Sequence, residues 1–252
     1  MYSQDPVRRP LNTIDLLVNA LNQDPGRPLP HLPDGRTATV GEVCDATSQY
    51  VQALTSLGVV EGTRVALLSR NLPEVLHATH AAQVVGAVYI PLHPMGSQPD
   101  HLHTVRDAGV ELLIFEGGHY DARAAELAGE VPGLRLVALG RTELAGDLRD
   151  LAASMRPEPL RPPMLDPDGA ERISYSGGTT GSPKSVATRR GTSAALWSIM
   201  LAEGDWPRPP RVLPCAPLSH AGGTMFLPTL LRDGTLPIHP GFDPPAVLRA
   251  LT

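Results

Sequence analysis

The chain has 252 residues, a formal net charge of -5 and only 4% aromatic residues. An acidic balance, with basic residues paired only at Arg8–Arg9 and Arg189–Arg190, lacks the electrostatic signature of a nucleic-acid-binding protein. The length suffices for one large domain or two small ones with an ample core.

Helices and strands are predicted to alternate along the first half of the chain. Thr39, followed three residues later by Glu42, is a capping-box pattern that opens a helix ending at Leu57, with Gly58 as its stop. Asn71 is predicted to cap the next helix, which runs to residue 85. Further helices are expected at residues 99–108 and 119–129, and strands at 65–69, 87–91, 110–115 and 134–139. This alternation indicates an α/β fold with parallel sheets covered by helices.

Residues 156–169, RPEPLRPPMLDPDG, contain five prolines and few large apolar groups. Because proline prevents helix formation and stiffens the chain, we interpret this segment as a linker. It would separate a first α/β subdomain, residues 1–155, from the start of a second one, residues 170–252. A strand at 172–175 and helices at 191–201 and 244–251 are predicted in the second part.

The segment after the predicted strand, YSGGTTGSPKSV at residues 175–186, combines glycines, hydroxyl side chains and Lys184. Glycines let successive backbone N–H groups turn toward an anion, hydroxyls add donors, and lysine supplies a mobile positive charge. The segment is therefore predicted to hold a polyphosphate. It is not a P-loop, because Pro183 stands where that pattern requires glycine. The alternative is a solvated Gly/Ser turn without a ligand.

This segment resembles the phosphate motif of the adenylate-forming superfamily, YTSGTTGxPKG, with departures at Gly177 and Ser185. Three further segments resemble the same family in the same order: VVGAVYIPLHP, ATRRGTSAAL and LPCAPLSHAGG. The last is similar to the P-L-x-H-x-x-G segment of acyl- and aryl-CoA synthetases. The likeness extends over residues 13–252 and implies the N-terminal domain of the acyl-CoA synthetase fold.

The resemblance implies ATP-dependent conversion of a carboxylic acid to an acyl-adenylate and then to acyl-CoA. A fatty acid is the favoured substrate class. It implies ATP, Mg²⁺ and coenzyme A as reactants or cofactors. The ATP phosphates would contact Ser176, Gly177, Gly178, Thr179, Thr180, Gly181 and Lys184. Lys184 and His220 would act in catalysis, and the acyl or adenylate pocket would include His220, Gly222 and Gly223.

Members of the resembled family are about twice as long as this chain. We therefore expect an incomplete N-terminal domain that lacks the mobile C-terminal lid domain, is inactive alone, and exposes apolar surface around the helix at residues 244–251. Two alternatives stay open. One is a truncated nucleotide-binding or partner-binding module without turnover, and the other is an acyl-AMP ligase or amino-acid-activating domain.

Other features of the sequence bear on the compartment, on membrane spans and on metal binding. Cys44 and Cys215 lie far apart without CxxC spacing, which favours a reducing, cytoplasmic compartment over a disulfide. No apolar run is long enough to span a bilayer, and the N-terminus does not have the form of a secretory signal. The histidine pairs His77/His80 and His101/His103 have no third ligand beside them, so no metal site is expected.

Overall fold

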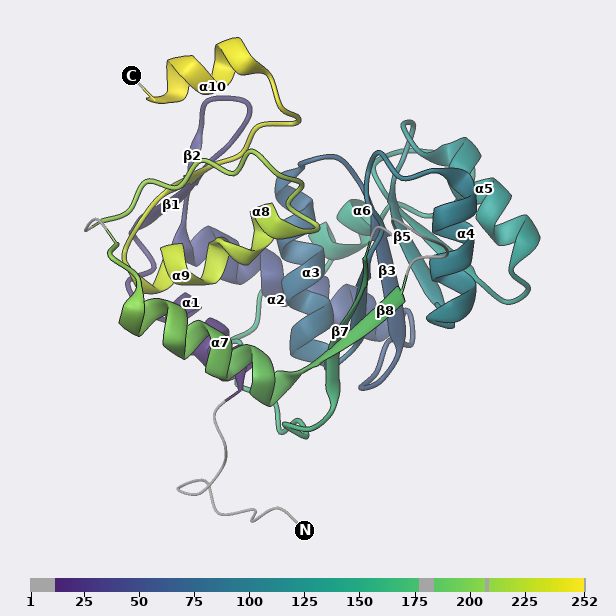
Figure 1. Cartoon of the computed structure of the whole chain (residues 1–252), viewed down its shortest axis with the longest axis horizontal. Helices are drawn as coiled ribbons and strands as arrows, with labels where there is room; N and C mark the ends of the chain where they lie inside the picture. The colour runs from purple at the N-terminus through teal and green to yellow at the C-terminus, as the bar shows by residue number, and fades with distance from the viewer. Residues whose placement is uncertain (1–11, 177–183, 207–208, 252) are drawn as a thin grey trace.

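The computed structural model describes residues 12–176, 184–206 and 209–251, and Figure 1 shows how these segments are arranged. The helices are α1 (Thr13–Leu21), α2 (Val40–Ser56), α3 (Pro73–Val85), α4 (Gln98–Asp107), α5 (Asp121–Glu130), α6 (Leu148–Ala153), α7 (Arg190–Glu203), α8 (Ala221–Thr224), α9 (Phe226–Leu231) and α10 (Pro244–Leu251). The strands are β1 (Pro28–His31), β2 (Thr37–Thr39), β3 (Arg64–Leu68), β4 (Val88–Pro91), β5 (Leu112–Glu116), β6 (Arg135–Leu139), β7 (Ala170–Ser176), β8 (Lys184–Arg189) and β9 (Leu236–Pro237).

A six-stranded sheet with the order β6-β5-β3-β4-β7-β8 forms the centre of the molecule. Its neighbouring strands are parallel except for β7 and β8, which pair antiparallel. The predicted alternation of helices and parallel strands is confirmed, and each predicted boundary lies within two residues of the observed one.

The two faces of this sheet carry separate hydrophobic cores, because successive side chains of a strand point to opposite faces. Val65 and Leu67 of β3 pack in the core that α2, α3 and α6 cover. Ala66 and Leu68 pack in the other core, under α4 and α5. Figure 1 shows these two helical layers on either side of the sheet.

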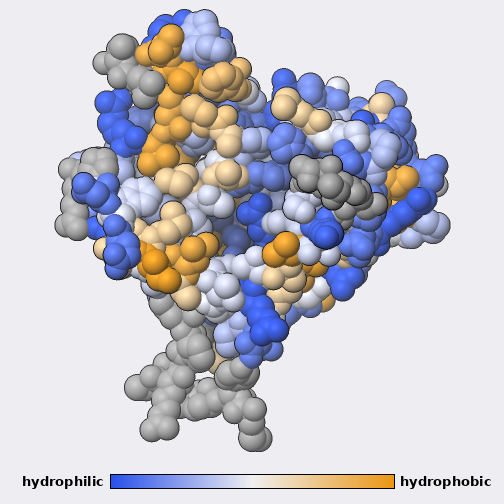
Figure 2. Space-filling model, in the orientation of Figure 1, coloured by the Kyte–Doolittle hydropathy of each residue, from blue (hydrophilic) through white to orange (hydrophobic). Residues whose placement is uncertain are grey.

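A small second sheet, ordered β2-β1-β9, joins the two ends of the described chain. β1 pairs antiparallel with β2 and parallel with β9. Nearby, Phe242, just before α10, and Leu248 in α10 are about two-thirds exposed, at 65% and 66%. Apolar groups gather on the surface around α10 and again along α7 (Figure 2), where Leu196 and Ile199 are exposed.

The start of α2 confirms the predicted capping box. The backbone N–H of Glu42 donates to Thr39 Oγ1 at 3.2 Å, and the backbone N–H of Thr39 donates to Glu42 Oε2 at 2.7 Å. The predicted cap of α3 is wrong: Leu72, and not Asn71, occupies the N-cap position and makes no side-chain cap bond, while Pro73 begins the helix. The Asn71 side chain instead accepts from the backbone N–H of Leu218 at 2.7 Å, so a long-range contact takes the place of the local one.

Residues 157–165 form neither helix nor strand and lie along α2. Gln49 Nε2 donates to the carbonyl of Met155 at 2.8 Å, and the N–H of Glu158 donates to Ser48 Oγ at 2.9 Å. Leu160 is buried. The six-stranded sheet contains strands from both sides of residues 156–169, and the division into two subdomains there stays a prediction.

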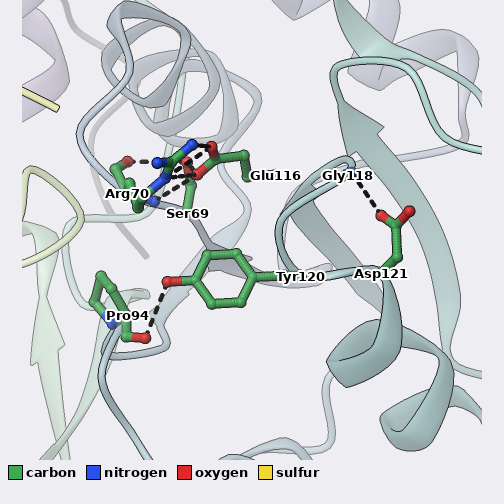
Figure 3. Close-up of polar contacts among 7 residues, drawn as sticks. All are labelled: Ser69, Arg70, Pro94, Glu116, Gly118, Tyr120 and Asp121. Carbon is green, nitrogen blue, oxygen red and sulfur yellow. Dashed lines mark hydrogen bonds and ion pairs between the residues drawn. The ribbon is translucent and has the colours of Figure 1, made fainter.

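An ion pair links the carboxyl ends of the neighbouring parallel strands β3 and β5 (Figure 3). The guanidinium of Arg70 contacts the buried carboxylate of Glu116, whose Oε2 also accepts from the backbone N–H of Arg70 at 2.9 Å. Burial alone would raise the pKa of Glu116, but the hydrogen bonds and charge of Arg70 outweigh it and hold that pKa below its usual value. Beside this pair, the Tyr120 hydroxyl donates to the carbonyl of Pro94 at 2.9 Å.

Candidate functional site

The hairpin of β7 and β8 flanks the segment predicted to bind phosphate. Ser176 is paired with Lys184 in the antiparallel register, and Ser176 Oγ donates to the carbonyl of Lys184 at 3.4 Å. Both residues are exposed. The predicted contacts of Gly177, Gly178, Thr179, Thr180 and Gly181 fall outside the described residues. The described part therefore places Ser176 and Lys184 opposite each other, at the two ends of the predicted phosphate segment.

Tyr175 fixes the end of β7 against α4. Its hydroxyl donates to Asp107 Oδ2 at 2.6 Å, and its ring meets His103 edge to face. Burial, together with the hydrogen bond and charge of Asp107, raises the pKa of the Tyr175 phenol. The tyrosine of the motif is thus a structural anchor for the strand that leads into the phosphate segment.

His220 lies in the turn before α8. Its Nδ1 is 2.9 Å from Ser219 Oγ, and its ring meets the edge of His93 with the two centroids 5.1 Å apart. Burial, reinforced by the nearby positive charge of Arg172, lowers the pKa of His220 to about 4. The imidazole is therefore neutral at pH 7 and can donate or accept one hydrogen bond without carrying charge.

Gly222 and Gly223 are required by the close packing of this turn. A Cβ atom on Gly222 would lie 2.4 Å from the carbonyl oxygen of Ala216, and one on Gly223 would lie 2.0 Å from that of Leu218. Backbone atoms cannot yield to such contacts as a flexible side chain would. The two glycines thus allow α8 to start directly against the 216–218 backbone, which sets the position of His220.

A cavity of about 220 Å³ lies between β7, α3, α7 and the turn of His220. We call it the β7 cavity. Its lining residues are Thr13, Leu17, Leu76, Thr79, His80, Gln83, Tyr89, Glu171, Arg172, Ser174, Thr188, Ser193, Leu196, Trp197, Leu218, Ser219, His220, Gly223, Thr224 and Leu227. Of the predicted site residues in the described part of the chain, His220 and Gly223 line this cavity, whereas Ser176, Lys184 and Gly222 do not.

Two cavity residues that the sequence analysis did not single out are Glu171 and Arg172. Glu171 is buried, and burial raises its pKa to about 7. The Arg172 guanidinium lies 5.9 Å from the centre of the Tyr89 ring. The sequence signal was the adjacent acid–base pair in the otherwise uncharged strand AERISYS, because a charged residue is rarely buried without a partner.

Arg189 and Arg190 lie at the junction of β8 and α7, and Arg190 is turned into the protein. Arg190 is buried and donates to the carbonyl of Gly86 at 2.7 Å and to that of Asp166 at 3.0 Å. It also pairs with Glu61 at 3.3 Å. Arg190 therefore ties the start of α7 to residues 86 and 166, while Arg189 is exposed.

The described residues contain no group of three or more His, Cys, Asp and Glu side chains that could hold a metal ion. Mg²⁺ commonly keeps several waters and binds through one or two carboxylates and substrate phosphates. The described donor set therefore does not form a dedicated Mg²⁺ site. Within the same part of the chain, both cysteines are free, and no helix has the length and hydropathy needed to cross a membrane.

The chain is similar to known proteins over nearly its whole length. The sequence model of the family described as AMP-binding enzyme matches residues 17–252. The medium/long-chain-fatty-acid–CoA ligase FadD8 of Mycobacterium tuberculosis is 40% identical over 99% of this chain and 45% of its own length. A feruloyl-CoA synthase of Amycolatopsis sp is 34% identical over 86% of this chain and 42% of its own. The chain spans less than half the length of these curated relatives.

Solved structures share the fold. The amide bond synthetase McbA of Marinactinospora thermotolerans is 26% identical and superposes with a TM-score of 0.81 over 96% of this chain and 47% of its own. ATP-bound MatB of Rhodopseudomonas palustris, 21% identical, gives a TM-score of 0.80 over 96% of this chain and 48% of its own. These matches confirm the expected α/β fold of the N-terminal domain of adenylate-forming enzymes. The chain belongs to the AMP-binding enzyme family.

Proposed function

We propose that this chain forms the part of an ATP-dependent acid–CoA ligase that holds the carboxylic acid and the triphosphate. In the reaction, a carboxylate oxygen attacks the α-phosphorus of ATP and pyrophosphate leaves, which yields an acyl-adenylate. The thiol of coenzyme A then attacks the acyl carbon and displaces AMP. Both steps depend mainly on positioning and on neutralising charge.

This proposal rests on the position of strand β7, which lines the cavity and leads into the predicted phosphate segment. Ser174 lines the β7 cavity, and Ser176 stands opposite Lys184 at the end of the same strand. Two residues of a strand span about 7 Å. An acid in the cavity would therefore lie within reach of a nucleotide held at residues 176–184.

Lys184 and His220 have separate roles in this proposal. The ammonium group of Lys184 would neutralise the pyrophosphate as it leaves, together with donors from residues 176–181. His220 would orient the carboxylate through a hydrogen bond, since its lowered pKa keeps the ring neutral. A neutral ring can donate a hydrogen bond to the attacking carboxylate. It carries no positive charge that would attract this carboxylate away from the phosphorus. Gly223 and Thr224 would border the reacting carboxylate.

Mg²⁺, when bound, would supply further charge neutralisation at the phosphates. We assign no residue of this chain to it, because the described donors form no cluster. We likewise propose, without assigning residues, that coenzyme A is the thiol substrate, that a lid domain takes part in the reaction, and that the protein is cytoplasmic.

A fatty acid remains the proposed substrate class. The 40% identical relative is named for medium- and long-chain fatty acids, and the β7 cavity has apolar walls from Leu17, Leu76, Leu218 and Leu227. Ligand pockets usually measure about 300–1,000 Å³, so a cavity of about 220 Å³ suits the shorter acids of that class.

Acid-dependent exchange of labelled pyrophosphate into ATP tests the proposed function. The chain and the full-length 40% identical relative are assayed side by side with the same fatty acids. We expect exchange by the full-length enzyme, and ATP and acid binding without exchange by this chain, because the remaining half of the relatives' length would supply the missing groups. If this chain binds neither ATP nor any acid, the proposed function is wrong; exchange by this chain alone would refute only the expected need for further segments.

A further inference from the structure

A second cavity lies between α2, α3, α6 and the β1–β2 hairpin. We call it the α2–α3 cavity, since these two helices lie side by side (Figure 1). Its volume of about 520 Å³ falls within the range of about 300–1,000 Å³ that is usual for ligand pockets. Glu74 and His77 of α3 line it, whereas Thr79 and Gln83 of the same helix line the β7 cavity. The two cavities therefore adjoin different faces of α3.

Tyr50 of α2 brings a hydroxyl group to the α2–α3 cavity. The residue lines the cavity and is only 5% exposed, and its hydroxyl has no hydrogen-bond partner among the described residues. Burial raises the pKa of this phenol, as does the negative charge of Glu74, so the group keeps its proton at pH 7. Because buried polar groups nearly always have a partner, the partner of Tyr50 is expected in the cavity.

His77 adds a second polar group beside Tyr50. The centroids of the two rings are 5.8 Å apart, and the Nδ1 atom of His77 is buried without a hydrogen-bond partner in the described part of the chain. Burial lowers the pKa of His77 to about 4, so the ring is neutral at pH 7 and has one nitrogen that accepts. His77 lies three residues after Glu74, which places both on one face of α3.

Glu74 supplies a negative charge to this face. Its carboxylate makes neither a hydrogen bond nor an ion pair with the described residues. Arg149 is within electrostatic reach of it, but the two oxygens of Asp147 already accept from the Nε and Nη2 atoms of Arg149 at 3.3 and 3.1 Å. Arg36, the other arginine of the cavity, is paired with Glu42 at 2.9 Å. The charge that is left for a ligand is therefore negative.

These groups match a ligand ammonium better than other polar groups. A protonated primary amine donates three hydrogen bonds, and the Glu74 carboxylate, the Tyr50 oxygen and a His77 nitrogen can each accept one. A ligand carboxylate or phosphate would be repelled by Glu74, while the nearby arginine charges are already paired. A neutral hydroxyl would gain nothing from the charge of Glu74. The remaining walls are apolar and include Leu32, Val43 and Ala46.

We propose that the α2–α3 cavity is a binding site for a small primary amine with an apolar body, whose ammonium group is held by Glu74 and Tyr50. The site lies apart from the phosphate segment, and the inference does not rest on the proposed function.

Titration calorimetry on the intact chain tests this site with two probes of nearly equal shape. 2-Phenylethylamine is protonated at pH 7, and 2-phenylethanol is its neutral counterpart. The amine is expected to bind about tenfold more tightly than the alcohol, because a charge-assisted hydrogen bond is stronger than a neutral one. In Glu74→Gln, which keeps the shape of the side chain, the amine should fall to the affinity of the alcohol, and the affinity of the alcohol should not change.

Glu203→Gln is the matched control, because Glu203 is exposed on α7 and no residue of α7 lines the α2–α3 cavity. It removes the same charge and should keep the preference for the amine. Tyr50→Phe is a second cavity variant that removes only the hydroxyl oxygen. It should weaken binding of the amine about fivefold, which keeps the test decisive even if Glu74→Gln does not fold.

The outcomes decide between a ligand site and a cavity that holds only water. Loss of the preference in Glu74→Gln, with the preference kept in Glu203→Gln, supports the amine site. If neither probe binds, or if the alcohol binds as tightly as the amine, the site is refuted. Amine binding that neither Glu74→Gln nor Tyr50→Phe changes would place the amine elsewhere and would refute it as well.

Discussion

The side-chain oxygen of Asn71, three residues after β3, accepts a hydrogen bond from the backbone N–H of Leu218 at 2.7 Å. Leu218 is buried and lies two residues before His220. The turn of the candidate catalytic histidine is therefore coupled to the central sheet by the Asn71 side chain, and also by Tyr89 of β4, whose hydroxyl donates to the carbonyl of Ser219 at 3.1 Å.

Asn71→Ala should destabilise the protein by about 1–3 kcal/mol, because it leaves the buried N–H of Leu218 without a partner. It should also weaken acid binding through the displaced turn. Asn19→Ala, at an exposed position of α1, is the control and should change the free energy of unfolding by less than about 0.5 kcal/mol. Urea unfolding measures both variants; equal effects would show that the bond from Asn71 does not hold the turn.

Arg190→Ala should lower the free energy of unfolding by about 3 kcal/mol. The variant removes charge-assisted bonds to two backbone carbonyls, those of Gly86 and Asp166, and such bonds contribute more than neutral ones. Its neighbour Arg189 is exposed, so Arg189→Ala provides a charge-matched control with an expected change near zero. Denaturant midpoints that shift equally in the two variants would contradict the structural role of Arg190.

Gly223→Ala should destabilise the protein by about 1–3 kcal/mol through overpacking, since its Cβ would lie 2.0 Å from the carbonyl oxygen of Leu218. Gly129→Ala is the control, because nothing lies within 4 Å of a Cβ at that position of α5. That variant should be unchanged or more stable by up to about 1 kcal/mol, as alanine favours helix over glycine. Thermal unfolding compares the two. A Gly223→Ala protein as stable as the wild type would mean that the 216–218 backbone can shift.

His80 should make stability depend on pH. Burial lowers its pKa in the folded protein to about 3, from 6.5, so between these values the unfolded chain binds a proton that the folded chain does not. The contribution of the neutral ring is complete above pH 6.5 and is lost as the pH falls toward 3, by at most about 1.4 kcal/mol per pH unit. His80→Leu should reduce this dependence, measured as the difference in unfolding free energy between variant and wild type at several pH values. A difference that is constant with pH would rule out this role of His80.

The sequence predicted most of the central sheet because its signals are local. The Thr39–Glu42 capping box and the short apolar strands depend on neighbours within a few residues, and both were confirmed. Strand β8 was not predicted, because it is almost wholly exposed and is defined by its pairing with β7.

The candidate site was predicted less completely, for a physical reason. Asn71 fits a local helix cap, yet its partner Leu218 lies 147 positions away, and Arg190 is buried by residues 86 and 166. Such contacts depend on topology and not on spacing. The charged pair Glu171–Arg172 was visible in the sequence, but its burial beside a cavity became apparent only in the fold.

In the proposed function, a nucleotide's phosphates bind at the end of the β7–β8 hairpin. The most direct test is the ATP affinity of Lys184→Ala, measured by titration calorimetry beside Arg189→Ala, which removes one positive charge from the other end of β8. Lys184 is the only lysine of the chain, so protection of that one ε-amine from an acylating reagent by ATP can be followed in the wild type and in Arg189→Ala. We expect at least tenfold weaker ATP binding in Lys184→Ala and near-native binding in Arg189→Ala. Unchanged affinity in Lys184→Ala, with Lys184 of the wild type equally reactive with and without ATP, would show that Lys184 does not hold the phosphates.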